Sequence, residues 1–327
     1  MDRLTTNEFM ISLANDLQKP RAGADDKEKP GLTESSAVSY LKLLYTLNGK
    51  KPFKSLAFLK KTGDIDSKLV EYADNTKKTI LGAVVGVMTL KKLKGYTKAL
   101  EHYREQLGLK AKELRALENT NVKSDKQAKN WESMDGINKR KAEALEALTK
   151  SLGKKAKITP AQFEDLLSYL IVSLYTDTSP RRNQDYMKMV IVKKWNDKTM
   201  PNDVNYLDIA GQRFIFNVYK TARKYGQHIV PVSESLNDVL TKYLKYHPDK
   251  GGKWLDTPHF LVAADGKPLS AINAITRRLN KWFGKNIGSS MLRHIWLSSK
   301  YNIEEMKKDA LDMGHSVEEQ KHYMKGE

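Results

Sequence analysis

The stretch FIFNVYKTARKYGQHIVPV, residues 214 to 232, separates this chain from an all-helical protein. Its apolar residues lie on both sides of a turn at Gly226, a pattern typical of two strands joined as a β-hairpin. Three cations, Lys220, Arg223 and Lys224, fall near that turn. The stretch therefore predicts a hairpin with a basic tip, and an ordinary exposed hairpin would have the same pattern.

Further strand-like runs precede the hairpin and predict a small antiparallel sheet. Turns at Pro201-Asn202 and Ala210-Gly211 separate them. The four predicted strands are Tyr186 to Lys193, Asn205 to Ile209, Arg213 to Lys220 and His228 to Val232.

Apolar residues at helical spacing lie on both sides of the sheet. The predicted helices are Pro160 to Tyr175, Glu234 to Tyr246, Ser270 to Phe283, Ser290 to Tyr301 and Ile303 to Met313. We therefore expect one domain over residues 155 to 327 that is mainly α with a small antiparallel β-sheet, an α+β fold.

The first part of the chain, residues 1 to 117, shows helical spacing alone, and no alternating pattern occurs before residue 185. Thr33 follows the Pro30-Gly31 break and is placed to cap a helix. This part predicts a small helical domain.

Residues 118 to 154 are polar and rich in lysine, with Trp131 as their one large aromatic residue. This composition predicts a basic linker. A solvated surface segment with Trp131 docked on a neighbouring domain fits equally well.

The charge of the chain favours an anionic partner. Its 57 Lys and Arg against 39 Asp and Glu give a formal net charge of +18, which attracts a polyanion such as nucleic acid. Charge alone leaves open a basic protein without such a partner. The chain has no cysteine, which excludes disulfides, thiolate chemistry and Cys-based zinc sites.

No signal peptide or membrane span is recognisable. Met1 to Gln18 mixes charged and apolar residues, and the longest apolar run, Thr79 to Leu90, is shorter than the ~20 residues that cross a bilayer. We expect a soluble intracellular protein with no membrane partner, in a nucleus, a viral factory or a bacterial cytoplasm.

Cutting a phosphodiester bond without a metal requires a nucleophile, fixed cations for the phosphate oxygens, and an acid that protonates the leaving oxygen. The first cations are in TDTSPRRNQDYMKM, residues 176 to 189, where Arg181 and Arg182 follow a turn at Pro180. Asp185 is close enough to orient a guanidinium, whose forked donors match phosphate oxygens. A surface Arg-Asp pair of little energetic value is the alternative.

Lys220, at the predicted hairpin tip, can deliver a proton to a departing 5′ oxygen, although Arg223 and Lys224 compete for that role. A third group of candidates lies at Ser290 to His294, where Gly288 and the following serines are good helix-starting residues. We expect Arg293 in the first turn, where free N–H groups and the helix dipole also favour an anion. His294 points elsewhere and is expected to be structural.

The fourth place is MGHSVEEQKHY, residues 313 to 323. His315 lies at a predicted helix junction and can donate a hydrogen bond to a phosphate. Tyr323 can attack phosphorus. Tyr219 and Tyr301 are competing tyrosines without this context.

In this order, these residues resemble the tyrosine recombinase (phage integrase) family, whose pattern runs arginine, hairpin lysine, His-x-x-Arg, His or Trp, then tyrosine. The matching residues are Arg182, Lys220, Arg293, His315 and Tyr323. Asp185 matches the acidic position that follows the first arginine, and His294 the histidine that follows the second. The match covers about residues 155 to 325, and PRRNQDY and LRHIW are similar to integrase-like proteins of large DNA viruses and eukaryotic mobile elements.

Two positions depart from the family pattern. Ser290 replaces the first histidine of His-x-x-Arg, so the group that would assist proton removal from the tyrosine is missing or replaced, and slower chemistry is expected. Tyr323 follows His315 by eight residues, one fewer than in many members.

The resemblance implies that Tyr323 attacks a scissile phosphate and leaves a 3′-phosphotyrosyl link and a free 5′-hydroxyl. Arg182, Arg293 and His315 would hold the phosphorane, and Lys220 would protonate the leaving oxygen. Neither ATP nor a metal nor another cofactor is implied. The implied partners are double-stranded DNA and three further copies of the chain, as a homo-tetramer on two DNA sites, with residues 1 to 117 as the core-binding domain.

Two other functions remain open. A type IB topoisomerase shares these residues but acts as a monomer and relaxes supercoils. A DNA-binding protein derived from a recombinase would have lost catalysis, with Ser290 as a sign of that loss.

Overall fold

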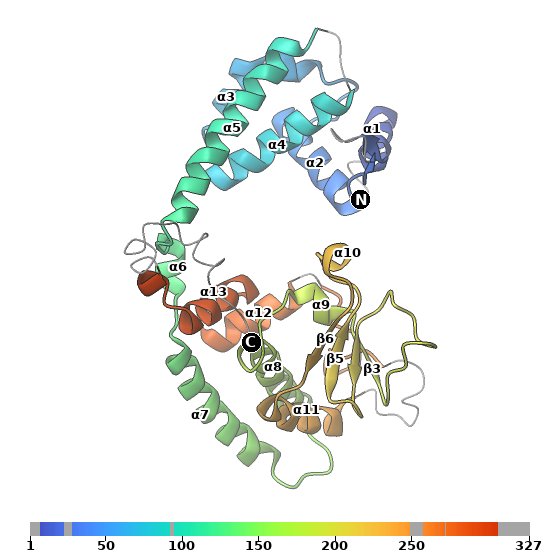
Figure 1. Ribbon diagram of the computed structural model, residues 1–327, viewed down its shortest axis with the longest axis vertical. Coiled ribbons are helices and arrows are strands. Elements are labelled where there is room, and N and C mark those ends of the chain that lie inside the picture. Colours follow the sequence, from blue (N-terminus) through green and yellow to red (C-terminus); the bar gives the residue numbers. More distant parts are fainter. Residues whose placement is uncertain (1–6, 23–27, 92–94, 249–257, 272, 307–327) are drawn as a thin grey trace. The chain divides into compact units, whose positions relative to one another are not determined.

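The computed structural model describes residues 7–22, 28–91, 95–248, 258–271 and 273–306. The chain divides into two compact units, Met1–Val122 and Lys123–Glu327 (Figure 1). The described residues are mainly helical with a small four-stranded sheet, which confirms the α+β class. Among these residues, none of the helices has the length and hydropathy of a membrane span.

The first unit is helical, as predicted, apart from one pair of two-residue antiparallel strands. Its elements are α1 (Glu8–Gln18), β1 (Arg21–Ala22), β2 (Glu28–Lys29), α2 (Glu34–Leu47), the 3-10 helix η1 (Ala57–Lys60), α3 (Thr62–Leu69), α4 (Asp74–Lys91) and α5 (Thr97–Asn119). The Thr33 side chain accepts from the backbone N–H of Ser36 at the start of α2, so the predicted cap is confirmed. The buried Tyr103 hydroxyl donates to the Leu59 carbonyl at 2.9 Å and ties α5 to η1.

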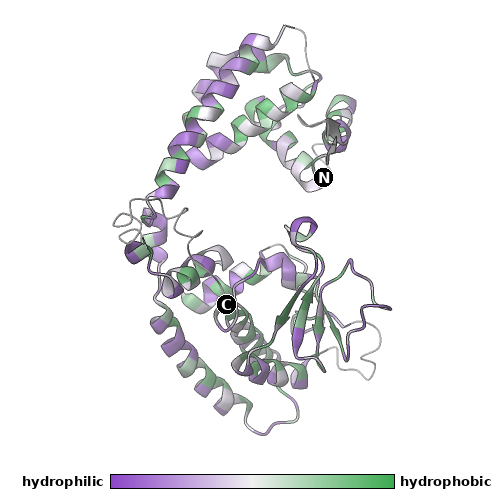
Figure 2. Ribbon diagram, in the orientation of Figure 1, coloured by the Kyte–Doolittle hydropathy of each residue, from purple (hydrophilic) through white to green (hydrophobic). Residues whose placement is uncertain are grey.

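The second unit is built around α8 (Pro160–Thr176). Its other elements are α6 (Asp125–Asn130), α7 (Met134–Leu152), α9 (Asn183–Met187), β3 (Val190–Val192), β4 (Tyr206–Asp208), β5 (Arg213–Phe216), α10 (Ala222–Tyr225), β6 (His228–Pro231), α11 (Glu234–Tyr246), α12 (Ala274–Phe283) and α13 (Ser289–Lys300). A capping box of Thr159 and Gln162 starts α8, with Pro160 in the first turn. From Tyr169 to Thr176 every residue of α8 is buried, and α7, α11, α12 and α13 pack against it (Figure 2).

The sheet has the strand order β3-β4-β5-β6, and it is mixed rather than antiparallel. β3 pairs with β4 in parallel, whereas the other two pairs are antiparallel. Parallel neighbours need a crossover of about a dozen residues or more, which residues 193 to 205 supply. The prediction of an antiparallel sheet was therefore wrong for its first pair, because the Pro201-Asn202 turn belongs to a crossover.

All four predicted strands are shorter in the structure, and two of them differ by several residues. The run Tyr186 to Lys193 begins inside α9, and only Val190–Val192 is a strand. The strand that was predicted to continue to Lys220 ends at Phe216. It ends there because the next two backbone N–H groups, of Asn217 and Val218, donate to the side chain of Asn205 and not to a neighbouring strand.

The segment predicted as a basic linker, residues 118 to 154, is largely folded. It contains the end of α5, all of α6 and all of α7. Ile137, Leu148 and Leu152 form an apolar stripe that is buried in the core with α8, and Trp131 packs at its edge. Lys141 of α7 forms an ion pair with Asp177 at the end of α8, and both side chains are nearly buried. The many charged residues of α7 made this apolar stripe hard to recognise in the sequence.

We predict that Lys141→Ala destabilises the second unit by about 3 to 5 kcal/mol, because it leaves Asp177 as a buried charge without its cation. Lys139→Ala is the matched control, since Lys139 is an exposed lysine of the same helix. Urea unfolding of the full chain measures both free energies. Equal effects of the two changes would contradict a structural role for Lys141.

Candidate functional site

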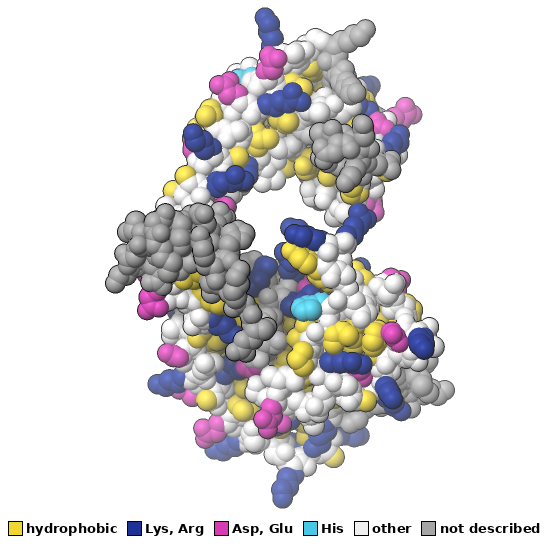
Figure 3. Space-filling model, in the orientation of Figure 1, with side chains coloured by type: hydrophobic (Ala, Val, Ile, Leu, Met, Phe, Trp, Pro, Cys, Tyr) yellow, Lys and Arg dark blue, Asp and Glu magenta, His cyan; other side chains and the backbone are white. Residues whose placement is uncertain are grey.

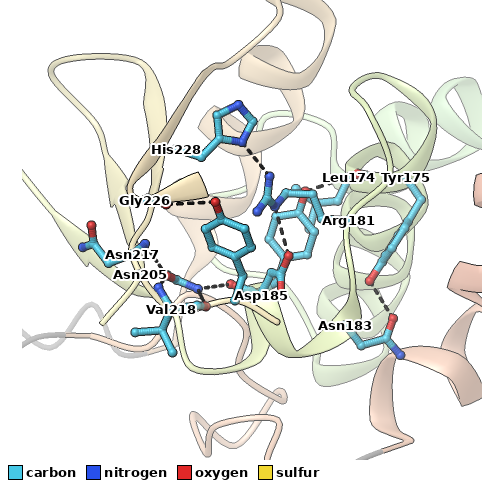
Figure 4. Close-up of polar contacts among 12 residues, drawn as sticks. Leu174, Tyr175, Arg181, Asn183, Asp185, Asn205, Asn217, Val218, Gly226 and His228 are labelled. Carbon is cyan, nitrogen blue, oxygen red and sulfur yellow. Dashed lines mark hydrogen bonds and ion pairs between the residues drawn. The ribbon is translucent and has the colours of Figure 1, made fainter. Parts of the chain in front are cut away.

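Arg181 and Arg182 lie in the loop from α8 to α9, and Arg181 is held within the fold (Figure 4). Arg181 donates from Nε to Asp185 Oδ2 at 3.0 Å and from Nη1 to His228 Nδ1 at 2.9 Å. Its guanidinium lies 3.8 Å from the centroid of the Phe216 ring. The predicted contact of Asp185 with an arginine is therefore made by Arg181.

Arg182 has different surroundings. It occupies the N-cap position of α9 without a side-chain capping bond and is half-buried. Within the described part of the chain, no hydrogen bond or ion pair involves its guanidinium. Arg182 is thus the arginine of this loop that is able to bind an external anion.

Asp185 explains why the two arginines differ. Its side chain is 4% exposed, and burial raises its pKa above the ordinary value of a carboxyl group, while Arg181 and, to a smaller extent, Arg182 act in the opposite direction. An ionised carboxylate at this depth needs a bonded cation. Arg181 supplies that cation and is not available for a second role.

Asn183 connects the arginine loop to the helices at the other end of the sequence. Its Oδ1 accepts from the Tyr175 hydroxyl at 2.7 Å (Figure 4). Its Nδ2 donates to Thr276 Oγ1 of α12 at 3.0 Å. Thr276 lies against Gly288, where a Cβ atom would meet its Cγ2 at 3.3 Å. Because Gly288 is the N-cap of α13, Asn183 fixes the start of α9 close to the start of α13.

Arg293 lies one turn into α13, not in the first turn as predicted. Its guanidinium points back toward the start of the helix, where Nη2 donates to Ser290 Oγ at 3.0 Å. Burial raises the pKa of Tyr175 well above its ordinary value, and the positive charge of Arg293 acts in the opposite direction.

The other predicted residues of α13 also differ from expectation. Ser290 is the hydrogen-bond partner of Arg293, a role that the sequence analysis did not foresee. His294 is exposed on α13, and among the described residues no hydrogen bond or ion pair gives it the structural role that was expected.

Lys220 is exposed in the connection between β5 and β6, two residues before the start of α10. The Tyr219 hydroxyl closes this connection by donating to the Gly226 carbonyl at 2.8 Å. The Asn205 side chain joins the base of the connection to α9 (Figure 4). Asparagine is uncommon in strands, so its position just before β4 was the available signal for this role.

Hydrogen bonds of two asparagines thus connect chain segments next to predicted site residues, although the side chains of Arg182, Lys220 and Arg293 take no part in these bonds. Asn183 links the segment of Arg182 to α12 and the start of α13, and Asn205 links it to the connection that carries Lys220. His315 and Tyr323 lie outside the described residues. Of the competing tyrosines, Tyr219 uses its hydroxyl within the fold, and Tyr301 is 59% exposed.

In the part of the chain that the structure describes, no three His, Asp or Glu side chains are grouped so that they could hold a metal ion. Comparisons with protein-family models, with curated proteins and with solved structures found no match.

We predict that Arg181→Lys lowers the free energy of unfolding by about 1.5 to 3 kcal/mol, because a lysine cannot bond Asp185 and His228 together. Arg182→Lys is the matched control and should change that free energy by less than about 0.5 kcal/mol. Urea unfolding checks both values. A larger loss for Arg182→Lys would show that the roles of the two arginines are reversed.

Proposed function

We propose that this chain is a tyrosine recombinase, which cuts and rejoins double-stranded DNA through a 3′-phosphotyrosyl intermediate. The main support is the arrangement around α9, where Asn205 bonds the segments of Arg182 and Lys220 together, and Asn183 bonds Thr276 of α12, which lies against Gly288 at the start of the Arg293 helix. The second support is the order of these residues, which continues along the sequence with His315 and Tyr323.

In the proposed step, the Tyr323 oxygen forms a bond to phosphorus while the bond from phosphorus to the 5′ oxygen breaks. The phenol proton passes to solvent, and the 5′ oxygen leaves as a hydroxyl with a proton from Lys220. Arg182, Arg293 and His315 bind the non-bridging oxygens, whose charge grows in the transition state. The phosphotyrosine retains the phosphoester bond, so attack by a 5′-hydroxyl rejoins the strand without ATP.

The proposed partner is double-stranded DNA, and the assembly a homo-tetramer on two DNA sites. Lys and Arg side chains are spread over the visible face of both units, with fewer acidic ones among them (Figure 3). The net charge of +18 makes counterion release from DNA a favourable contribution to binding. The helical first unit takes the part of a core-binding domain in this proposal.

We expect Tyr323→Phe to abolish covalent adducts and to leave salt-sensitive DNA binding unchanged, since only the attacking oxygen is removed. The assay uses nicked suicide duplexes drawn from the DNA that flanks the gene, with adducts resolved on a denaturing gel. Tyr301→Phe is the matched control, because Tyr301 is an exposed tyrosine near the same end of the chain.

Adducts that survive Tyr323→Phe would refute the assignment of the nucleophile. Binding without any wild-type adduct would favour a non-catalytic DNA-binding protein. Relaxation of plasmids that lack a specific site, with no strand exchange, would favour a topoisomerase.

Arg182→Ala and Arg293→Ala should each slow adduct formation by about 10²- to 10³-fold, because each removes a cation that stabilises the transition state. DNA binding should weaken far less, with the slope of log affinity against log salt reduced by about one. Single-turnover trapping and salt titrations measure the two effects. An equal loss of binding and of rate would place these arginines in general DNA binding and not at the scissile phosphate.

A further inference from the structure

The side chain of Asn205 is buried and uses its full hydrogen-bonding capacity. Nδ2 donates to the carbonyls of Asp185 and Val218, each at 2.9 Å. Oδ1 accepts from the backbone N–H groups of Asn217 and Val218, each at 2.8 Å. A primary amide has two donors and two acceptor positions, so every one is satisfied here at 3% exposure (Figure 4).

These bonds join two segments that carry proposed catalytic groups. Asp185 lies in α9, three residues after Arg182, and Val218 lies two residues before Lys220. Arg181 also contacts both segments, but it reaches the connection by stacking 5.0 Å from the Tyr219 ring centroid, which restrains distance less sharply than hydrogen bonds do. Asn205 therefore fixes where the connection starts relative to α9.

We propose that Asn205 is a positioning residue for strand cleavage, whose amide holds the Lys220 ammonium within reach of the 5′ oxygen of a phosphate bound at Arg182. This inference rests on the proposed function. Proton transfer needs hydrogen-bond distance between the acid and the leaving oxygen, and a displacement of about 1 Å can cost on the order of 10²-fold in rate. Asn205 itself contacts neither the DNA nor the reacting atoms in this proposal.

The deciding experiment replaces the leaving oxygen by sulfur. The substrate is the nicked duplex on which the wild-type protein forms its adduct, made with either oxygen or sulfur at the 5′ bridging position of the scissile phosphate. A thiolate is a much weaker base than an alkoxide and leaves without a proton, so sulfur bypasses the general acid.

Asn205→Asp preserves shape but sets an oxygen against the carbonyls of Asp185 and Val218, which breaks the link. On the oxygen substrate, we expect Asn205→Asp and Lys220→Ala each to slow adduct formation by about 10²-fold. On the sulfur substrate, both should react within about threefold of the wild type, whereas Arg182→Ala should stay slow on both substrates because it acts on the non-bridging oxygens.

Two controls separate positioning from a general loss of structure. Asn217→Ala removes side-chain bonds to the Val204 carbonyl and to Gln227 at the base of the same connection, but none to α9, and should keep the wild-type rate on both substrates. In a double-mutant cycle, Asn205→Asp should add no further loss to Lys220→Ala, since both act through the same proton.

A third measurement does not depend on activity. Hydrogen exchange should lose protection at the Asn217 and Val218 amides in Asn205→Ala, while the core helix α8 stays protected. Asn205→Ala also replaces Asn205→Asp in the sulfur assay if the latter does not fold.

An Asn205 defect of the same size on both substrates would overturn the inference and leave the proposed function intact. The same holds for a loss that adds in full to that of Lys220→Ala, or for unchanged exchange at both amides. Absence of any wild-type adduct would overturn the proposed function and the inference with it.

Discussion

The candidate site depends on the burial of one carboxylate. The side chain of Asp185 is 4% exposed, and a carboxylate so far from solvent is stable in its ionised form only beside a cation. Arg181 is that cation, and a further N–H donor and its ring contact attach the α9 loop to β6 and β5 through His228 and Phe216. The guanidinium of the next residue, Arg182, forms no hydrogen bond or ion pair with the described residues. A pair of adjacent arginines is thereby divided into one that holds the fold and one that can bind an anion.

The lysine-rich helix α7, which precedes α8 in the sequence, also supports the loop between α8 and α9. Its apolar stripe packs on α8, and Lys141 pairs with Asp177, the residue at which α8 ends and the arginine loop begins. The Ser233 hydroxyl donates to the carbonyl of the same Asp177 at 3.2 Å, so the start of α11 also contacts this point. The loop therefore leaves α8 from a position that three helices fix. α7 therefore belongs to the second unit. If this segment were a free linker, Asp177 would lack its cation.

Strong periodic patterns made α8, α11, α12 and α13 predictable, whereas α6 and α7 lay in the segment that was predicted as a linker. The bounds of α11 agree with those predicted, and α8 ends one residue later than predicted. The sequence-based prediction was wrong where hydrogen bonds to a single side chain set the course of the backbone. Nothing local indicates that Asn205 would accept the amides of Asn217 and Val218 and so end β5 early. Nor does the spacing of Arg181 and Arg182 show which one meets Asp185, since positions three and four residues apart on a helix are both neighbours. Lys220 and Arg182 were placed by motif order, and the structure adds the contacts that join their segments. His315 and Tyr323 stay predictions.

The serine at position 290 has a different meaning once Arg293 is located. From the sequence, Ser290 marks a lost histidine and hence weaker chemistry. In the structure, its hydroxyl accepts from Arg293 Nη2 one turn later on the same helix, while Nε points to the Ser289 carbonyl at 3.4 Å. Both contacts draw the guanidinium back along α13 toward Gly288, the end of the helix that Asn183 and Thr276 hold near α9. The serine hydroxyl accepts from the guanidinium without adding charge, as the acceptor nitrogen of a neutral imidazole could. Ser290 is thus compatible with the proposed phosphate site of Arg182 and Arg293. Its presence does not by itself indicate that catalysis has been lost.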